Sequence, residues 1–169
     1  INTRPLRTLC VLAIAGGSFA LPPAILEEAL FRGVIFGLAQ RYLRNIWVAS
    51  FVQALLFALA HSAQLLPNPI QGIYFFAYAL FAAALKFCTG SLSVVIALHW
   101  TWNTCLFLCA GWPEIGDPIP GFDPSSLAFM IASVIVFIVG TFLLIVAHRG
   151  CPCVLVLRRN AATTNAPRA

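Results

Sequence analysis

Long apolar runs, interrupted by proline, glycine or charged residues, make up most of the chain. They predict membrane-spanning helices near residues 8–21, 23–40, 46–64, 70–87, 91–110 and 126–147. Because a helix needs about 20 residues to cross roughly 30 Å of hydrocarbon, the first two predicted spans are short. Pro22 and Pro23 lie between them and predict a break in the chain below the membrane surface. The pattern indicates an all-α fold, a polytopic membrane bundle of about six transmembrane helices.

Composition agrees with this interpretation. Of the 169 residues, 61% are hydrophobic and only 9% are charged, which leaves too few polar side chains to cover a globule in water. The sequence contains no linker and no internal repeat, so we predict a single membrane domain over residues 1–169. The opening INTRPLRT lacks the features of an intact signal peptide, and we expect an N-terminal piece to be missing.

The basic residues predict how the chain is oriented in the membrane. With six spans, every Lys and Arg except Arg32 falls on one side of the membrane: Arg4, Arg7, Arg41, Arg44, Lys86 at the end of the fourth span, Arg149, Arg158, Arg159 and Arg168. The loop at residues 111–125, on the opposite side, carries acidic residues and no Lys or Arg. By the positive-inside rule, both termini face the cytoplasm, stroma or matrix, including the basic tail at 149–169 that follows the last span at 126–147. No basic face with interleaved aromatic residues predicts binding to nucleic acid, and lipid is the expected surrounding.

A few ionisable residues lie inside the predicted spans, and each is a functional candidate because a charge in hydrocarbon is costly. Glu28 and Arg32 are spaced i,i+4 in the favourable order, so Arg32 is expected to offset the charge of Glu28. Glu27 lies about 100° further round the helix, so its partner must come from another span. The alternative is that all three charges form one buried ion-pair cluster that holds helices together.

Polar side chains from three spans are expected to meet at one depth, nearer the side without basic residues. Phe57 and His61 share one helix face in FALAHS, and His99 and Asn103 share one in HWTWNT. In a wet cavity, Glu27 is placed to take a proton from a water molecule that His61 helps to hold. His99 and Asn103 are placed to donate hydrogen bonds to the oxyanion that forms on a peptide carbonyl.

The residues alone leave other chemistries open. Glu27, His61 and His99 also suit a zinc site with an open water position, although the HExxH spacing of soluble zinc proteases is absent. A lone intramembrane histidine often bonds one helix to another, and the same residues suit a proton pathway. Because no serine or cysteine is placed as well beside a histidine, activated water is favoured over a covalent nucleophile.

Three stretches of the sequence carry a family resemblance. EEALFRG, FALAH and HWTWN resemble, in order and spacing, the EExxxR, FxxxH and HxxxN motifs of the CPBP family, the CAAX-processing and bacteriocin-processing (Abi) intramembrane endopeptidases. The resemblance covers about residues 20–110, the expected catalytic core. It implies a glutamic-type intramembrane protease similar to type II CAAX prenyl endopeptidases, with no cofactor or, alternatively, with zinc.

The resemblance also implies roles for individual residues. By position, Glu27 matches the catalytic glutamate, His61 the histidine that helps to bind water, and His99 with Asn103 the oxyanion-stabilising pair. Supporting positions of the motifs match Glu28, Arg32 and Phe57. The implied substrate is a membrane protein or a membrane-associated peptide. Some family members serve instead as scaffolds or assembly subunits, so a catalytically idle subunit of a larger membrane complex is the alternative function.

Overall fold

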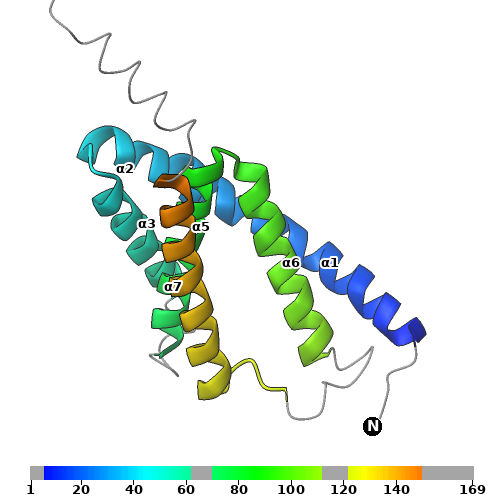
Figure 1. Cartoon of the computed structure of the whole chain (residues 1–169). Helices are drawn as coiled ribbons and strands as arrows, with labels where there is room; N and C mark the ends of the chain where they lie inside the picture. The colour runs from blue at the N-terminus through cyan, green and yellow to red at the C-terminus, as the bar shows by residue number, and fades with distance from the viewer. Residues whose placement is uncertain (1–5, 62–69, 112–121, 150–169) are drawn as a thin grey trace, which may run out of the picture.

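The structure is a computed structural model that describes residues 6–61, 70–111 and 122–149. Every regular element in these ranges is a helix, which confirms the predicted all-α fold (Figure 1). In chain order the elements are α1 (Leu6–Glu28), the π-helical turn η1 (Ala29–Ile35), α2 (Phe36–Leu43), α3 (Ile46–Ala60), α5 (Ile70–Thr89), α6 (Leu92–Ala110) and α7 (Leu127–Arg149). Most of the predicted loop at 111–125 and of the tail at 149–169 lies outside the described residues.

The predicted break at Pro22 and Pro23 is wrong. Both prolines lie inside α1, and α1, η1 and α2 form one helical segment of 38 residues. Proline removes a backbone donor but does not end a helix by itself when neighbouring helices support the chain. The first two predicted spans are therefore a single helix of about 57 Å at 1.5 Å per residue. Glu27 lies near its middle and not at the start of a second span.

The number of membrane passes changes with this correction. Among the described residues, four helices are long and apolar enough to cross a membrane, and α3 is a shorter apolar helix (Ile46–Ala60). The chain is therefore a multi-pass membrane protein, and its described part has fewer than the six spans predicted. Because α6 runs antiparallel to α1, the start of α1 lies at the same end of the bundle as the start of α7, and α7 ends at the other (Figure 1). The prediction that both termini share one side rested on six spans, so the side on which each terminus lies stays a prediction.

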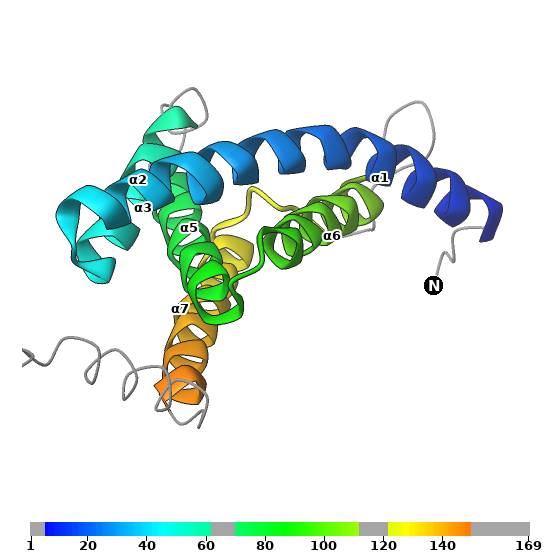
Figure 2. The ribbon, with the colours of Figure 1, turned by 90° about the horizontal axis from the view of Figure 1, so that it is seen from above.

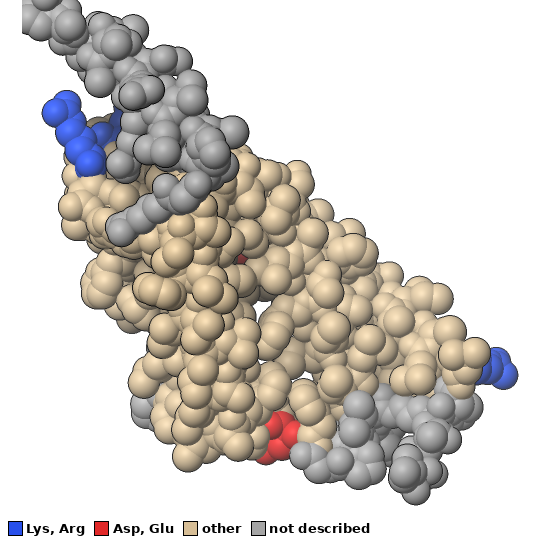
Figure 3. Space-filling model, in the orientation of Figure 1, with Lys and Arg blue, Asp and Glu red and all other residues tan. Residues whose placement is uncertain are grey.

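Apart from Glu27, Glu28 and Arg32, the described charges lie near the ends of the helical segments. Arg41 lies in the last turn of α2 and Lys86 in the last turn of α5, whereas Arg7 lies in the first turn of α1. Between these ends, the face in Figure 3 is almost entirely uncharged. The end that carries Arg41, Arg44 and Lys86 is called the basic end below.

The helices pack as two groups. The long α1 lies along α6, while α5 packs between α3 and α7 (Figure 2). Close approach of α1 and α6 depends on glycine, because a Cβ added at Gly16 would lie 2.8 Å from the Cβ of Phe107. Next to it, the indole Nε1 of Trp100 donates a hydrogen bond to the carbonyl of Gly17 at 2.8 Å.

This close approach gives a testable prediction. Gly16→Ala is expected to destabilise the protein by about 1–3 kcal/mol, because two Cβ atoms fixed to their backbones cannot both occupy the space. Gly37→Ala is the matched control, since a Cβ there meets nothing within 4 Å. In a helix, alanine at such a position should instead stabilise by up to about 1 kcal/mol. Titration with SDS in mixed micelles measures the stability of both variants. A Gly16→Ala variant as stable as wild type would contradict the close packing of α1 on α6.

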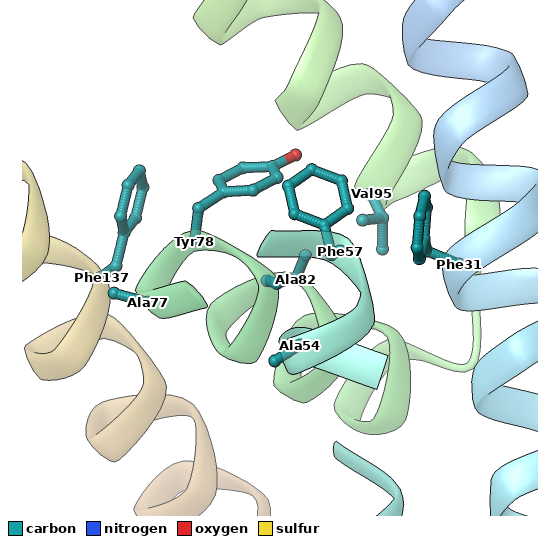
Figure 4. Close-up of a cluster of buried hydrophobic side chains, with 9 residues drawn as sticks. Phe31, Ala54, Phe57, Ala77, Tyr78, Ala82, Val95 and Phe137 are labelled. Carbon is teal, nitrogen blue, oxygen red and sulfur yellow. The ribbon is translucent and has the colours of Figure 1, made fainter. Parts of the chain in front are cut away.

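The core lies where the two groups meet. Phe57 of α3 contacts Phe31 of η1 edge to face, with ring centroids 5.0 Å apart, and lies 5.8 Å from the ring of Tyr78 (Figure 4). Alanines on α5 let its neighbours approach closely, and Gln53 of α3 donates a hydrogen bond to the carbonyl of Ala79 at 2.9 Å. This packing fixes α3 and α5 beside the two glutamates.

The start of α7 is also held locally. The carboxylate of Asp123 accepts hydrogen bonds from the hydroxyl (2.6 Å) and the backbone N–H (2.8 Å) of Ser125. These bonds, the hydroxyl first, lower the pKa of the exposed Asp123 carboxyl. Ser126 accepts a hydrogen bond from the N–H of Phe129, which satisfies a free donor at the start of the helix.

Candidate active site

Glu28 is the centre of a buried polar cluster. Its side chain is fully buried, and its Oε1 atom accepts three hydrogen bonds. The donors are Nη1 of Arg32 at 3.1 Å, the hydroxyl of Tyr78 at 3.1 Å and Nδ1 of His99 at 2.7 Å. The i,i+4 pair of Glu28 and Arg32 expected from the sequence is therefore present. It also ties α1 and η1 to α5 and α6.

Arg32 is held by aromatic rings as well as by Glu28. Its guanidinium carbon lies 4.4 Å from the ring centroid of Phe57 and 5.4 Å from that of Tyr78. Its Nε and Nη2 atoms and Oε2 of Glu28 have no hydrogen-bond partner in the described part of the chain. The ring faces attract the cation electrostatically. Phe57, expected as a supporting residue, therefore lies directly against the charge that compensates Glu28.

Glu27 differs from Glu28 in its exposure. Its side chain is 30% exposed, and its Oε2 atom lies 3.7 Å from Nε2 of His61 and 3.9 Å from Nε2 of His99. Both distances are too long for a direct hydrogen bond. The expectation that the partner of Glu27 comes from another span is met by two imidazoles, one at the end of α3 and one on α6.

Hydrogen bonds fix the orientation of both imidazoles. Nδ1 of His61 lies 2.8 Å from the carbonyl of Phe57, and Nδ1 of His99 lies 2.7 Å from the Glu28 carboxylate. Since a carbonyl and a carboxylate only accept, each Nδ1 carries a proton. In the neutral form, each Nε2 then presents a lone pair toward Glu27. His99 can donate through Nε2 only when it is an imidazolium.

These groups line one cavity of about 380 Å³. Its polar wall consists of Glu27, His61, His99 and Asn103. Its other wall is mainly aromatic, with Tyr74, Phe75, Tyr78, Trp102 and Phe129 among the lining residues. The cavity reaches the start of α5 at Gln71 and the segment before α7 at Pro124 and Ser125, so it lies toward the end of the bundle opposite the basic end. This agrees with the depth expected from the sequence.

Several lining residues were not expected from the sequence. Tyr78 bonds to Glu28, Phe75 stacks on His61 with ring centroids 4.4 Å apart, and Tyr74 accepts a hydrogen bond from Trp102 at 2.7 Å. From the sequence alone, the aromatic and mostly uncharged helix α5 suits contact with lipid, pigment or a partner helix equally well. The available signal was the i,i+4 spacing of Tyr74 and Tyr78, which puts two hydroxyl groups on one face of an apolar helix.

Comparison with known proteins adds one finding. Residues 9–105, more than half of the chain, match the family described as Type II CAAX prenyl endopeptidase Rce1-like. No curated protein and no solved structure matches the chain. The matched range contains the buried glutamate cluster and all four residues of the polar wall of the cavity.

Proposed function

Because the chain belongs to the Rce1-like family of type II CAAX prenyl endopeptidases, which are intramembrane proteases, we propose that it cleaves a peptide bond of a membrane-associated protein or peptide with water activated by Glu27. One observation carries this proposal. A partly exposed carboxylate faces the Nε2 atoms of two oriented imidazoles at 3.7 and 3.9 Å, inside a cavity large enough for a peptide segment. This is an arrangement suited to binding and deprotonating water.

The proposed reaction begins with a water molecule between Glu27 and His61. Glu27 takes one proton as the water oxygen attacks the peptide carbonyl, and Nε2 of His61 accepts a hydrogen bond from the same water. The developing oxyanion accepts hydrogen bonds from the carboxamide of Asn103 and from His99 as an imidazolium. Glu27 then gives the proton to the leaving amine, so that the C–N bond breaks and one acid and one amine form.

In this reaction Glu28 acts as a positioning residue. Its bond to Nδ1 of His99 fixes the imidazole with Nε2 toward the cavity. Arg32 and Tyr78 keep Glu28 itself in place. The division of roles between the two glutamates follows from exposure, since Glu28 is sealed from the cavity water and Glu27 is not.

The proposal is tested with purified wild-type protein in lipid vesicles and a library of membrane peptides. Mass spectrometry of the products should reveal cleavage at a small number of peptide bonds. Folded protein that cleaves no peptide would count against the proposal and favour a scaffold or assembly subunit of a membrane complex.

Zinc is the second candidate mechanism, and the orientation of the imidazoles favours it. Histidine ligands of zinc commonly donate the second ring N–H to a carboxylate or a backbone carbonyl, as His99 and His61 do. Against it, ligands of one tetrahedral zinc at about 2.0–2.1 Å lie roughly 3.4 Å apart, less than the 3.7 and 3.9 Å found here. Repeating the library assay with a chelator separates the mechanisms, since only the zinc mechanism predicts loss of cleavage and its recovery when zinc is added.

Tyr78 provides a prediction about the supporting cluster. Tyr78→Phe removes one of three donors to a buried carboxylate and is expected to destabilise the protein by about 1–3 kcal/mol. It should also lower the hydrolysis rate severalfold, because His99 depends on the position of Glu28. SDS titration and a cleavage assay measure the two effects. Tyr42→Phe, at a tyrosine that is 75% exposed, is the control and should change neither. If Tyr78→Phe changes neither the stability nor the hydrolysis rate, the hydrogen bond to Glu28 contributes to neither.

A further inference from the structure

The seam between α6 and α7 differs from the other seams of the bundle. These helices follow one another in the chain, yet α6 packs on α1 and α7 packs on α5 (Figures 1 and 2). Both of those interfaces are closed by a glycine under an aromatic side chain, Gly16 under Phe107 and Gly140 under Phe81. The helices α6 and α7 have no comparable interface with each other in the described structure. They can therefore separate without breaking a tightly packed helix pair.

One side chain bridges this seam. The ring of Trp102, on α6, lies 5.2 Å from the ring of Phe137 and 6.3 Å from that of Phe129, both on α7. Its indole Nε1 donates a hydrogen bond to the hydroxyl of Tyr74 on α5 at 2.7 Å. Trp102 thus joins three helices at the place where two of them are otherwise loosely packed.

The catalytic cavity lies directly behind this side chain. Trp102 is itself a lining residue, next to Asn103 on one side of the seam and Phe129 on the other. A polypeptide that passed between α6 and α7 would therefore reach the polar wall without leaving the membrane. It would first have to displace the Trp102 ring.

We propose that a membrane-anchored substrate reaches Glu27 laterally from the bilayer, between α6 and α7, and that the Trp102 side chain swings out of the seam to admit it. This rests on the proposed function and adds the substrate class, a peptide whose scissile bond adjoins a transmembrane segment. Such a segment cannot leave hydrocarbon without exposing apolar surface to water. A loosely packed seam bridged by Trp102 lets the segment stay in lipid while its end enters the cavity.

The test compares two substrates that contain the same cleaved sequence, taken from the most efficiently cleaved library peptide. One is fused to a transmembrane helix, and the other is a short free peptide. Both are offered to the protein in lipid vesicles. For Trp102→Ala, the ratio of kcat/KM for the anchored substrate to that for the free one should rise about tenfold, because the indole hydrogen bond and ring contacts no longer oppose opening.

Matched variants separate opening from general damage. Trp102→Phe keeps a ring in the seam but loses the bond to Tyr74, so we expect a smaller rise of about threefold. Trp100→Phe is the control, because Trp100 donates to Gly17 of α1 on a seam that has no role in the proposal. Its ratio should stay within about twofold of wild type. If Trp102→Ala fails to fold, Trp102→Phe alone carries the comparison.

The outcomes distinguish this inference from the proposed function. An unchanged or lower ratio in the Trp102 variants overturns lateral access, even when both substrates are cleaved. Equal losses for both substrates would make Trp102 a wall of the binding cavity and also overturn it. If wild-type protein cleaves neither substrate, the proposed function itself fails.

Discussion

Replacing Glu27 by glutamine is expected to lower the rate of peptide hydrolysis by about a hundredfold to ten-thousandfold, which leaves no measurable cleavage. The protein itself should stay folded in the membrane. Glutamine has nearly the same shape but cannot take a proton from water. The Glu27 carboxylate lies 3.7 and 3.9 Å from the two imidazoles and is 30% exposed, so no short buried bond is lost. The rate is measured by mass spectrometry of the products from a cleaved library peptide.

Two further observations make this prediction specific. Glu27→Asp keeps a base but withdraws it by one methylene group, so it should retain a small part of the activity. Size-exclusion chromatography in detergent should show equal amounts of folded Glu27→Gln and wild-type protein. Full activity in Glu27→Gln would refute the role of Glu27. Loss of the folded protein would instead support the alternative that the charges are one structural ion-pair cluster.

Replacing Arg32 by alanine is expected to reduce the yield of folded protein severely. The change removes the cation from a fully buried carboxylate, Glu28, and empties the space beside the rings of Phe57 and Tyr78. Breaking a buried ion pair in this way costs about 3–5 kcal/mol, which is a large part of the stability of a typical domain. The yield of monodisperse protein and its resistance to SDS measure the effect.

The explanation for Arg32 can be separated from loss of packing. In the double variant Glu28→Gln/Arg32→Ala, no unpaired charge remains, so a substantial part of the lost yield should return. Arg32→Lys keeps the charge but lacks a planar group that stacks on Phe57, and its stability should lie between the two. Arg41→Ala, at an exposed arginine, should match wild type. If Arg32→Ala alone folds as well as wild type, the pair with Glu28 has no structural importance.

Much of the site was predictable because charged residues are rare in apolar segments. The position of Glu28 and Arg32 one turn apart, and the separate orientation of Glu27, follow from helical geometry alone. The meeting of Glu27 with His61 and His99 followed from their depths. The three residues do meet, although the argument placed Glu27 at the start of a second span after a break at Pro22 and Pro23 that the structure does not contain.

The predicted break at Pro22 and Pro23 was wrong, and the aromatic residues of the cavity were missed, because both depend on tertiary contacts that a sequence pattern does not show. Whether a proline ends a helix depends on the neighbours that support the backbone, and α6 packs along this part of the chain. Neutral aromatic residues gave little signal, because a tyrosine or tryptophan in an apolar span suits lipid, a partner helix or a cavity equally well. The roles of Tyr78 and Trp102 can therefore be recognised only in the structure, where Tyr78 donates a hydrogen bond to Glu28 and Trp102 donates one to Tyr74.

The length of the first helical segment connects the site to the lipid around it. A helix of 38 residues is almost twice as long as the hydrocarbon is thick, so it cannot stand upright with its whole length in hydrocarbon. Glu27 lies near the middle of this long helical segment. A thicker bilayer makes the helix more upright and a thinner one makes it lie flatter, while His61 is carried by the separate, shorter α3. Bilayer thickness is therefore expected to act on the distance between Glu27 and His61, the two groups proposed to hold the water.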